Sequence, residues 1–270
     1  MRISRIVAFL LIPAIVSIQS CGRENSGKQN NPKASSITLF AASSLTEVLS
    51  QLVVAFEAEY PVKVKISTAS SGTLARQIEQ GAKPDLYLSA NSHWVNYLDS
   101  LGYMLQGSAS VVAKNELVLI GQLGSDPVDS SLSQSLLSIE HGKNAKLSMG
   151  KPAHVPAGLD TYQSLKYLGR LEEIEQKLIF TKDVRAALKL VELGEVSYGA
   201  VYKTDALRSK KVRILGKFPS ESHEPIVYTL GTCTGNPRVD DFRIFLSSEK
   251  GQALWQEYGF SIEVNLNESQ

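Results

Sequence analysis

The sequence contains only two cysteines, Cys21 and Cys233, in 270 residues. Two isolated thiols supply neither a C-x-x-C zinc or redox motif nor a disulfide framework. The formal net charge is only +1, so no overall field attracts nucleic acid or an anionic membrane. The sequence also lacks G-x-S-x-G, H-E-x-x-H and G-x-x-x-x-G-K-[ST], motifs that carry hydrolytic or phosphate chemistry. These absences favour a binding protein that is not an enzyme and needs no cofactor. The alternative is a hydrolytic triad of serine, histidine and aspartate.

The first 36 residues differ in composition from the rest. A short basic region, 1–5, precedes the segment 6–18, which is apolar except for Ser17 and short for a membrane span. This pattern predicts a secretory signal peptide over 1–20. Residues 18–22 read I-Q-S-C-G and resemble a bacterial lipobox, in which Cys21 would carry the lipid. The alternative is an ordinary signal peptide in which Cys21 is incidental.

The polar segment that follows has no hydrophobic periodicity. Residues 21–36 contain few apolar groups and cannot bury enough surface to order themselves. We therefore expect a flexible tether between a lipid anchor at Cys21 and a folded body. Such a chain would be a membrane-anchored lipoprotein of the periplasm or cell surface.

From residue 37 onward, strand patterns and helix patterns alternate along the chain. Short apolar or alternating runs at 37–41, 62–66 and 85–89 are each followed by apolar residues at helical spacing. Similar runs recur later, at 117–120, 146–149, 198–202, 211–215 and 226–230. This alternation predicts an α/β protein with largely parallel sheets. In such sheets ligands bind outside the carboxyl ends of the strands.

Two clusters of small hydroxyl residues lie where a predicted strand gives way to a helix. Residues 41–46 read A-A-S-S-L-T, and residues 69–73 read A-S-S-G-T. A helix start leaves backbone N–H groups unpaired and carries partial positive charge, and serine hydroxyls add neutral donors. The combination suits an anion, so we expect one small oxyanion between the two clusters. The simpler alternatives are that Ser44 caps a helix and that Ser71 belongs to a turn.

Five segments carry a resemblance to a known family. They are A-A-S-S-L-T, A-S-S-G-T-L-A-R-Q-I-E-Q-G-A-K-P-D-L-Y-L-S-A, H-V-P-A-G, D-V-R-A-A-L-K-L-V-E and G-A-V-Y-K-T-D-A, in this order. Together they resemble the periplasmic molybdate-binding component of ABC importers, over residues 37–262. The resemblance implies a bilobal periplasmic-binding-protein fold of type II, with two α/β lobes, a central cleft and two hinge crossings. We expect one lobe from residues 37–113 with 229–270 and the other from 114–228.

The resemblance also implies which positions bind the ligand, molybdate or tungstate. They are two serine hydroxyls, two positions that offer backbone N–H groups and one tyrosine hydroxyl: Ser44, Ser71, Ala157, Val184 and Tyr202. Tyr202 could instead be a half-buried aromatic with its hydroxyl in water. One departure from the family pattern is Lys151, where an acidic or amide residue is common before the proline of the H-V-P-A-G segment. This cation could alter the local field or the closure of the lobes.

A site built from neutral donors has consequences for selectivity. A fully deprotonated dianion only accepts hydrogen bonds, whereas hydrogenphosphate carries a proton that needs an acceptor. This argument disfavours phosphate but not other fully deprotonated oxyanions. The alternative ligand is one of these, such as sulfate or thiosulfate. The implied partners are the membrane permease and ATPase subunits of an ABC importer, and we expect a monomer that binds no nucleic acid.

Overall fold

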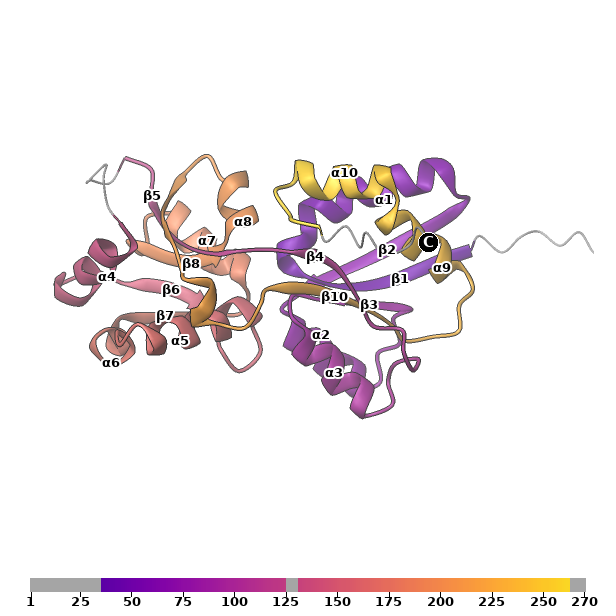
Figure 1. The fold of residues 1–270 in the computed structure, drawn as a ribbon, viewed down its shortest axis with the longest axis horizontal. Helices are drawn as coiled ribbons and strands as arrows, with labels where there is room; N and C mark the ends of the chain where they lie inside the picture. Colours follow the sequence, from indigo (N-terminus) through magenta and orange to yellow (C-terminus); the bar gives the residue numbers. More distant parts are fainter. Residues whose placement is uncertain (1–34, 125–130, 263–270) are drawn as a thin grey trace, which may run out of the picture. The chain divides into compact units, whose positions relative to one another are not determined.

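The computed structural model describes residues 35–124 and 131–262, which form two five-stranded sheets with helices packed on them (Figure 1). The predicted signal peptide and Cys21 lie outside the described residues, as does most of the predicted tether. Residues 35 and 36 were expected to end the tether, but they begin strand β1 (Ser35–Ala42) and pair with Val62 and Lys63. Strand pairing uses backbone groups, so the polar composition of these two residues does not reveal it.

The first sheet has the strand order β2-β1-β3-β10-β4. β1 is parallel to β2 and β3, whereas β10 is antiparallel to β3 and β4. Its other strands are β2 (Val62–Ala69), β3 (Leu86–Ser89), β4 (Ser110–Lys114) and β10 (Val227–Thr232). Its helices are α1 (Thr46–Glu59), α2 (Ser71–Glu79), α3 (Ser92–Ser100), α9 (Arg238–Ser247) and α10 (Glu249–Glu257), with the short 3-10 helix η1 (Ser43–Leu45) before α1.

The second sheet has the order β7-β6-β8-β5-β9. β6 is parallel to β7 and β8, whereas β5 is antiparallel to β8 and β9. Its strands are β5 (Leu117–Gln122), β6 (Leu147–Gly150), β7 (Leu178–Thr181), β8 (Tyr198–Tyr202) and β9 (Val212–Lys217). The remaining helices are α4 (Leu132–His141), α5 (Pro156–Tyr167), α6 (Leu171–Ile174), η2 (Glu175–Lys177), α7 (Val184–Glu192), α8 (Lys203–Arg208) and η3 (Ser220–Ser222). No helix among the described residues is long and apolar enough to cross a membrane.

The α/β class is confirmed. Both sheets are mixed, but four of the five strands in each run in the same direction, so the sheets are largely parallel as expected. In each sheet, parallel strands alternate with helices along the chain, as the pattern predicted. One strand in each sheet runs against the others, β10 in the first and β5 in the second, and each adjoins a connection between the sheets. Strand direction at these connections is set by the path of the chain between sheets, which hydrophobic periodicity does not record.

Two segments of chain connect the sheets, and they run beside each other (Figure 1). One is the short link between β4 and β5, and the other leads from β9 through η3 to β10. The Asn115 N–H donates to the Ile226 carbonyl at 3.0 Å, and the Phe218 N–H donates to the Leu117 carbonyl at 3.0 Å. Backbone hydrogen bonds therefore join the two connections where they pass.

The parallel strands determine where the helices begin. η1 with α1 follows β1, α2 follows β2, α5 follows β6, and α7 follows β7. Because parallel strands end at the same edge of a sheet, the helices that follow them start at that edge. Helix α1 is held there by an apolar face of Val48, Leu49, Leu52 and Phe56, all buried. This arrangement brings several helix N-termini to the carboxyl edge of each sheet.

Candidate anion-binding site

One small cavity is lined by residues that follow strands of both sheets. It has an empty volume of about 190 Å³, part of which is open to solvent. Its lining consists of Ala42, Ser43, Ser44, Ser70, Ser71, Ala90, Val155, Pro156, Ala157, Val184 and Tyr202. All five residues named from the sequence segments are in this set, so the fold brings them together. Among the described residues that line it, none carries a charged side chain.

Three helices begin at the cavity. Ser71 is the first residue of α2, Ala157 is the second residue of α5, and Val184 is the first residue of α7. N–H groups in the first turn of an α-helix have no acceptor within the helix, and the helix dipole makes this end partially positive. The cavity therefore faces backbone donors from elements of both sheets.

The starts of α5 and α7 are fixed by local structure. Pro156 is at the first position of α5, where its fixed backbone angle suits a helix and its missing N–H costs nothing. At α7, the Asp183 carboxylate accepts a hydrogen bond of 2.8 Å from the Ala186 N–H and caps the helix. The glycine after Ala157 lies directly against β6, since a Cβ on Gly158 would be 2.0 Å from the Gly150 carbonyl oxygen. The position of the Ala157 N–H is thus set by close backbone packing.

The Ser44 hydroxyl is held from behind by a tyrosine of strand β10. Ser44 Oγ lies 2.9 Å from Tyr228 Oη, and Tyr228 Oη accepts from Asn115 Nδ2 at 3.1 Å. The Glu116 N–H donates to Asn115 Oδ1, which identifies Nδ2 as the donor end of that amide. With Asn115 donating to it, Tyr228 can direct its own hydrogen to Ser44, an arrangement that leaves the Ser44 hydrogen available to the cavity. Ser44 is therefore not a side-chain cap, and α1 has none.

Ser71 accepts hydrogen bonds through both its side-chain and its carbonyl oxygen, and its hydroxyl hydrogen remains available to the cavity. The Ala90 N–H donates to Ser71 Oγ at 3.0 Å, and the Tyr87 hydroxyl donates to the Ser71 carbonyl at 2.8 Å. Ser71 is fully buried and begins α2 after Ser70, whose hydroxyl caps the helix. The interpretation of Ser71 as part of a simple turn is therefore wrong.

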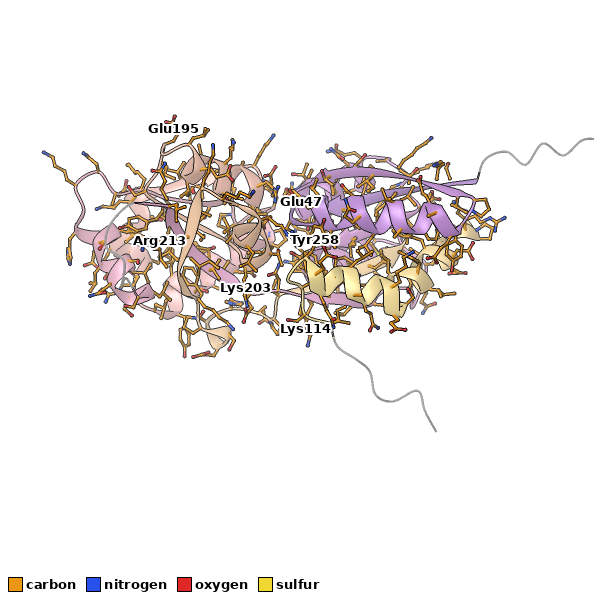
Figure 2. The ribbon with its side chains drawn as sticks, turned by 90° about the horizontal axis from the view of Figure 1, so that it is seen from above. Glu47, Lys114, Glu195, Lys203, Arg213 and Tyr258 are labelled. Carbon is orange, nitrogen blue, oxygen red and sulfur yellow. The ribbon has the colours of Figure 1, made fainter. Side chains whose placement is uncertain are left out.

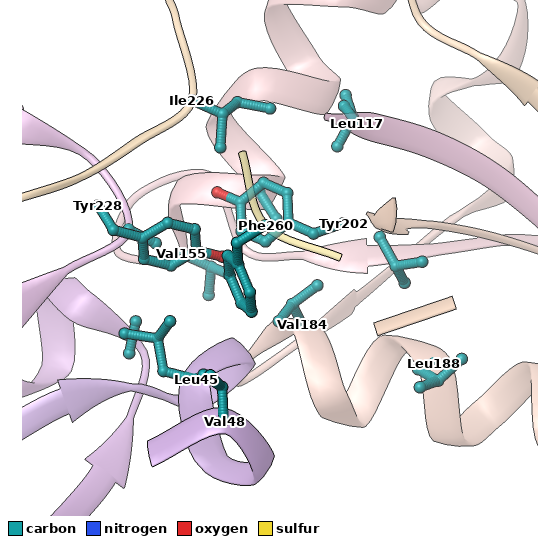
Figure 3. Close-up of a cluster of buried hydrophobic side chains, with 14 of the residues drawn as sticks. Leu45, Val48, Leu117, Val155, Val184, Leu188, Tyr202, Ile226, Tyr228 and Phe260 are labelled. Atoms are coloured by element: carbon teal, nitrogen blue, oxygen red, sulfur yellow. The ribbon is translucent and has the colours of Figure 1, made fainter. Parts of the chain in front are cut away.

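Tyr202 closes the cavity at the end of β8. Its side chain is only 1% exposed, so it is not the half-buried aromatic considered from the sequence. The Tyr202 hydroxyl donates to Asp160 Oδ2 at 3.1 Å, and its ring packs edge-on to that of Tyr228, with the two ring centres 6.2 Å apart. Figure 3 shows both tyrosines together with Val155 and Val184. Burial raises the pKa of Tyr202 well above its ordinary value, and the Asp160 charge adds to the shift, so the phenol stays neutral.

Charged side chains are found near the cavity rather than in its lining. Arg185, the residue after Val184, forms ion pairs with Glu47 of α1 and with Asp205, the latter at 3.0 Å. Burial lowers the pKa of Arg185, but the two carboxylates outweigh it and raise the pKa overall. Burial raises the pKa of Asp205 to about 7, although Arg185 acts in the opposite direction. The Arg185 charge is therefore paired with carboxylates outside the cavity lining.

Lys151 lies in a separate, open hollow. It lines that hollow with Arg76 and His154, and it is not part of the cavity lining. Burial lowers the pKa of His154, and the positive charges of Lys151 and Arg76 lower it further. Lys151 therefore contributes to a positive field beside the cavity and does not take the place of a predicted donor.

Sequence reasoning missed the residues that hold the hydroxyls from behind. Tyr228 contacts Ser44 across 184 positions of sequence, and Asp160 contacts Tyr202 across 42. In the sequence, Tyr228 is only part of an apolar strand pattern, and Asp160 is a polar residue on an amphipathic helix. Neither carries a local signal of its role, since the contact depends on how β8, β10 and α5 pack together.

The chain is similar in sequence and in fold to bacterial proteins that bind solutes. The family described as bacterial extracellular solute-binding protein matches residues 37–261. The molybdate-binding protein ModA of Haemophilus influenzae is 37% identical over 83% of this chain and 89% of its own length. A Bacillus subtilis protein, YvgL, named as a candidate ABC transporter substrate-binding lipoprotein, is 32% identical over 97% of both chains. The structure of the periplasmic molybdate-binding protein of Azotobacter vinelandii, 22% identical, superposes with a TM-score of 0.74 over 84% of this chain and 99% of that one.

Proposed function

Because the chain belongs to the family of bacterial extracellular solute-binding proteins, we propose that it captures molybdate and delivers it to an ABC importer. Membership of this family implies a solute-binding protein outside the cytoplasm, and not an enzyme. The observation that carries the proposal is the cavity lined by uncharged donors from both sheets. The similarity to a protein named for molybdate binding supports the choice of ligand.

The donor set suits a tetrahedral dianion. Two serine hydroxyls and the N–H groups of Ala157 and Val184 can each point a hydrogen at a ligand oxygen, and the Tyr202 hydroxyl can do so when its hydrogen is not donated to Asp160. Hydrogen bonds from neutral donors to a charged acceptor contribute about 1.5–3 kcal/mol each. Five of them can offset much of the lost hydration. Release remains possible because no buried cation is left without its counter-charge when the ligand leaves.

The proposal extends to the parts of the chain and the ligand that the family alone does not specify. Tungstate has the same charge and shape, so we propose it as a second ligand. We propose that Cys21 carries a lipid anchor and that the protein works as a monomer with a permease and an ATPase. The proposed lobes are residues 37–113 with 229–270, and residues 114–228. The two connections between the sheets would then be the hinge about which the lobes close.

Calorimetry with molybdate, tungstate, sulfate, thiosulfate and phosphate tests the ligand assignment. We expect tight binding of molybdate and tungstate, and little heat from the other three anions. Phosphate fails because its proton finds no acceptor in a cavity of donors. Sulfate or thiosulfate competing with molybdate at equal concentration would overturn the assignment and favour the alternative oxyanion.

A further inference from the structure

The three hydroxyls that line the cavity differ in what they contact on their far side. Ser44 is positioned by the Tyr228 hydroxyl, and Ser71 by the Ala90 N–H, so both can accept from behind and donate into the cavity. Tyr202 instead contacts the carboxyl group of Asp160, at 3.1 Å. A phenol has a single hydrogen, and an ionised carboxylate only accepts. With Asp160 ionised, the Tyr202 hydrogen therefore belongs to Asp160 and is not available to a ligand.

Asp160 is placed where a charge is poorly stabilised. It lies on α5, is 4% exposed, and is absent from the cavity lining, so it sits behind Tyr202. The titratable groups that act on it are Tyr202 at the end of β8, Glu224 between η3 and β10, and Tyr228 on β10. Among the described residues, no lysine, arginine or histidine forms an ion pair with it. Burial raises the pKa of Asp160 to about 8; the Tyr202 hydrogen bond opposes this shift, and the Glu224 charge adds to it.

We propose that Asp160 is a positioning residue that must be protonated for tight oxyanion binding. In the neutral form its O–H donates to Tyr202 Oη, and Tyr202 then donates its own hydrogen to the ligand, as Ser44 and Ser71 do. In the ionised form Tyr202 donates to Asp160 instead. The negative charge of Asp160 is then separated from the bound anion only by the Tyr202 side chain. The inference rests on the proposed function, since it specifies how that same cavity presents one of its donors.

The sign of the pH dependence follows from this arrangement. A dianion in the cavity favours the neutral form of Asp160, so binding raises its pKa further and takes up a proton when the free protein is ionised. Affinity is therefore constant below the Asp160 pKa and falls as pH rises above it. With a pKa of about 8 in the free protein, affinity at pH 9.5 is about 30-fold lower than at pH 6.5, because each unit beyond the pKa costs a factor of about ten.

The test is calorimetry of the full chain with molybdate between pH 6.5 and 9.5, in paired buffers with different ionisation enthalpies. Wild-type protein should lose about 30-fold in affinity over this range and take up about one proton per ligand at pH 9, but almost none at pH 6.5. The Asp160→Asn variant places an uncharged amide next to Tyr202 Oη, and its N–H can donate to that oxygen at every pH. Its affinity should stay at its own pH 6.5 value throughout, with no proton uptake. Asp99→Asn, an exposed position of α3, should keep the wild-type profile.

The outcomes separate this inference from the proposed function. Wild-type protein that binds molybdate with the same affinity at pH 6.5 and 9.5, without proton uptake, overturns the role of Asp160 and leaves molybdate capture intact. Parallel losses of affinity in Asp160→Asn and wild type overturn that role in the same way. Wild-type protein that does not bind molybdate at pH 6.5 overturns the proposed function and this inference with it. The wild-type profile decides the matter even if Asp160→Asn does not fold.

Discussion

At the scale of single residues, the cavity depends on which way each hydroxyl hydrogen points. Ser44 contacts the Tyr228 hydroxyl, Ser71 accepts from the Ala90 N–H, and Tyr202 contacts a buried carboxyl group. The side chains behind the lining therefore matter as much as those in it. A hydroxyl is useful to an anion only when its hydrogen is not engaged elsewhere.

Replacing Tyr202 with phenylalanine tests the contribution of one such donor. The change removes a hydrogen bond to a charged ligand worth about 1.5–3 kcal/mol, so molybdate affinity should fall by roughly ten- to a hundredfold. Calorimetry at pH 7 measures the loss, and thermal melting monitors the fold. Tyr198→Phe is the matched control, because Tyr198 lies on the same strand but outside the cavity lining. Equal affinities for the two variants would mean that the Tyr202 hydroxyl does not face the ligand.

All five positions predicted from the sequence line the cavity, but the sequence did not indicate what holds them. Ser44, Ser71 and Tyr202 lie in short segments whose composition and order resemble a known family, so their grouping could be expected. Tyr228 and Asp160 reach the site only through packing between distant elements. Long-range contacts of this kind leave no periodic or local signal in a single sequence.

At the scale of secondary-structure elements, helix α5 is positioned by glycine. Gly158 allows the start of α5 to approach the Gly150 carbonyl at the end of β6 so closely that no Cβ fits. This contact sets where the Ala157 N–H lies. The element therefore acts as a rigid support for one backbone donor, whatever the side chain of residue 157.

The variant Gly158→Ala should displace the start of α5. A Cβ placed 2.0 Å from a carbonyl oxygen forces the helix away from β6, and overpacking of this kind costs about 1–3 kcal/mol. We expect a lower melting temperature and at least tenfold weaker molybdate binding, since the Ala157 N–H moves with the helix. Gly235→Ala is the control, because a Cβ there meets nothing within 4 Å. Wild-type affinity in Gly158→Ala would contradict a role for α5 in placing a donor.

Elements with strong periodicity could be predicted, and elements without it could not. Helices α1 and α7 show clear apolar spacing and lie near the positions that this spacing predicts. Helix α4 begins at Leu132, in a stretch whose serine-rich composition predicts turns. Strands β4 and β7 are short, and their burial does not alternate cleanly. Their place is set by pairing with neighbours, which tertiary structure decides.

At the scale of the whole molecule, the proposed closure depends on contacts between groups of the two sheets. The Gly72 N–H of α2 donates to the His154 carbonyl at 2.9 Å. Glu47 of α1, labelled in Figure 2, pairs with Arg185 of α7, which also pairs with Asp205. Both contacts lie beside the cavity, so closing around a ligand and forming these contacts would be a single event. Ligand binding would then shift the population toward the closed form.

Glu47→Gln should weaken the closed form slightly. The pair is partly exposed, so the loss is that of a surface salt bridge, about 0.2–1 kcal/mol, which corresponds to a release of molybdate up to about fivefold faster. Stopped-flow fluorescence measures the dissociation rate directly. Glu59→Gln is the matched control. It removes a carboxylate of the same helix, α1, whose partner is Lys250 of α10, so this ion pair joins two helices of the first sheet. If both variants release molybdate at the same rate, the Glu47–Arg185 pair has no part in closure.

The proposed transport function depends on one cavity of uncharged donors that surrounds a tetrahedral oxyanion. A crystal of the protein grown with molybdate, measured at a wavelength where molybdenum scatters anomalously, locates the metal directly. We predict one anomalous peak with ligand oxygens at about 2.7–3.1 Å from Ser44 Oγ, Ser71 Oγ, Tyr202 Oη and the N atoms of Ala157 and Val184. A peak elsewhere, or one whose oxygens contact Arg185 or Lys151 in place of these atoms, would contradict the proposed site.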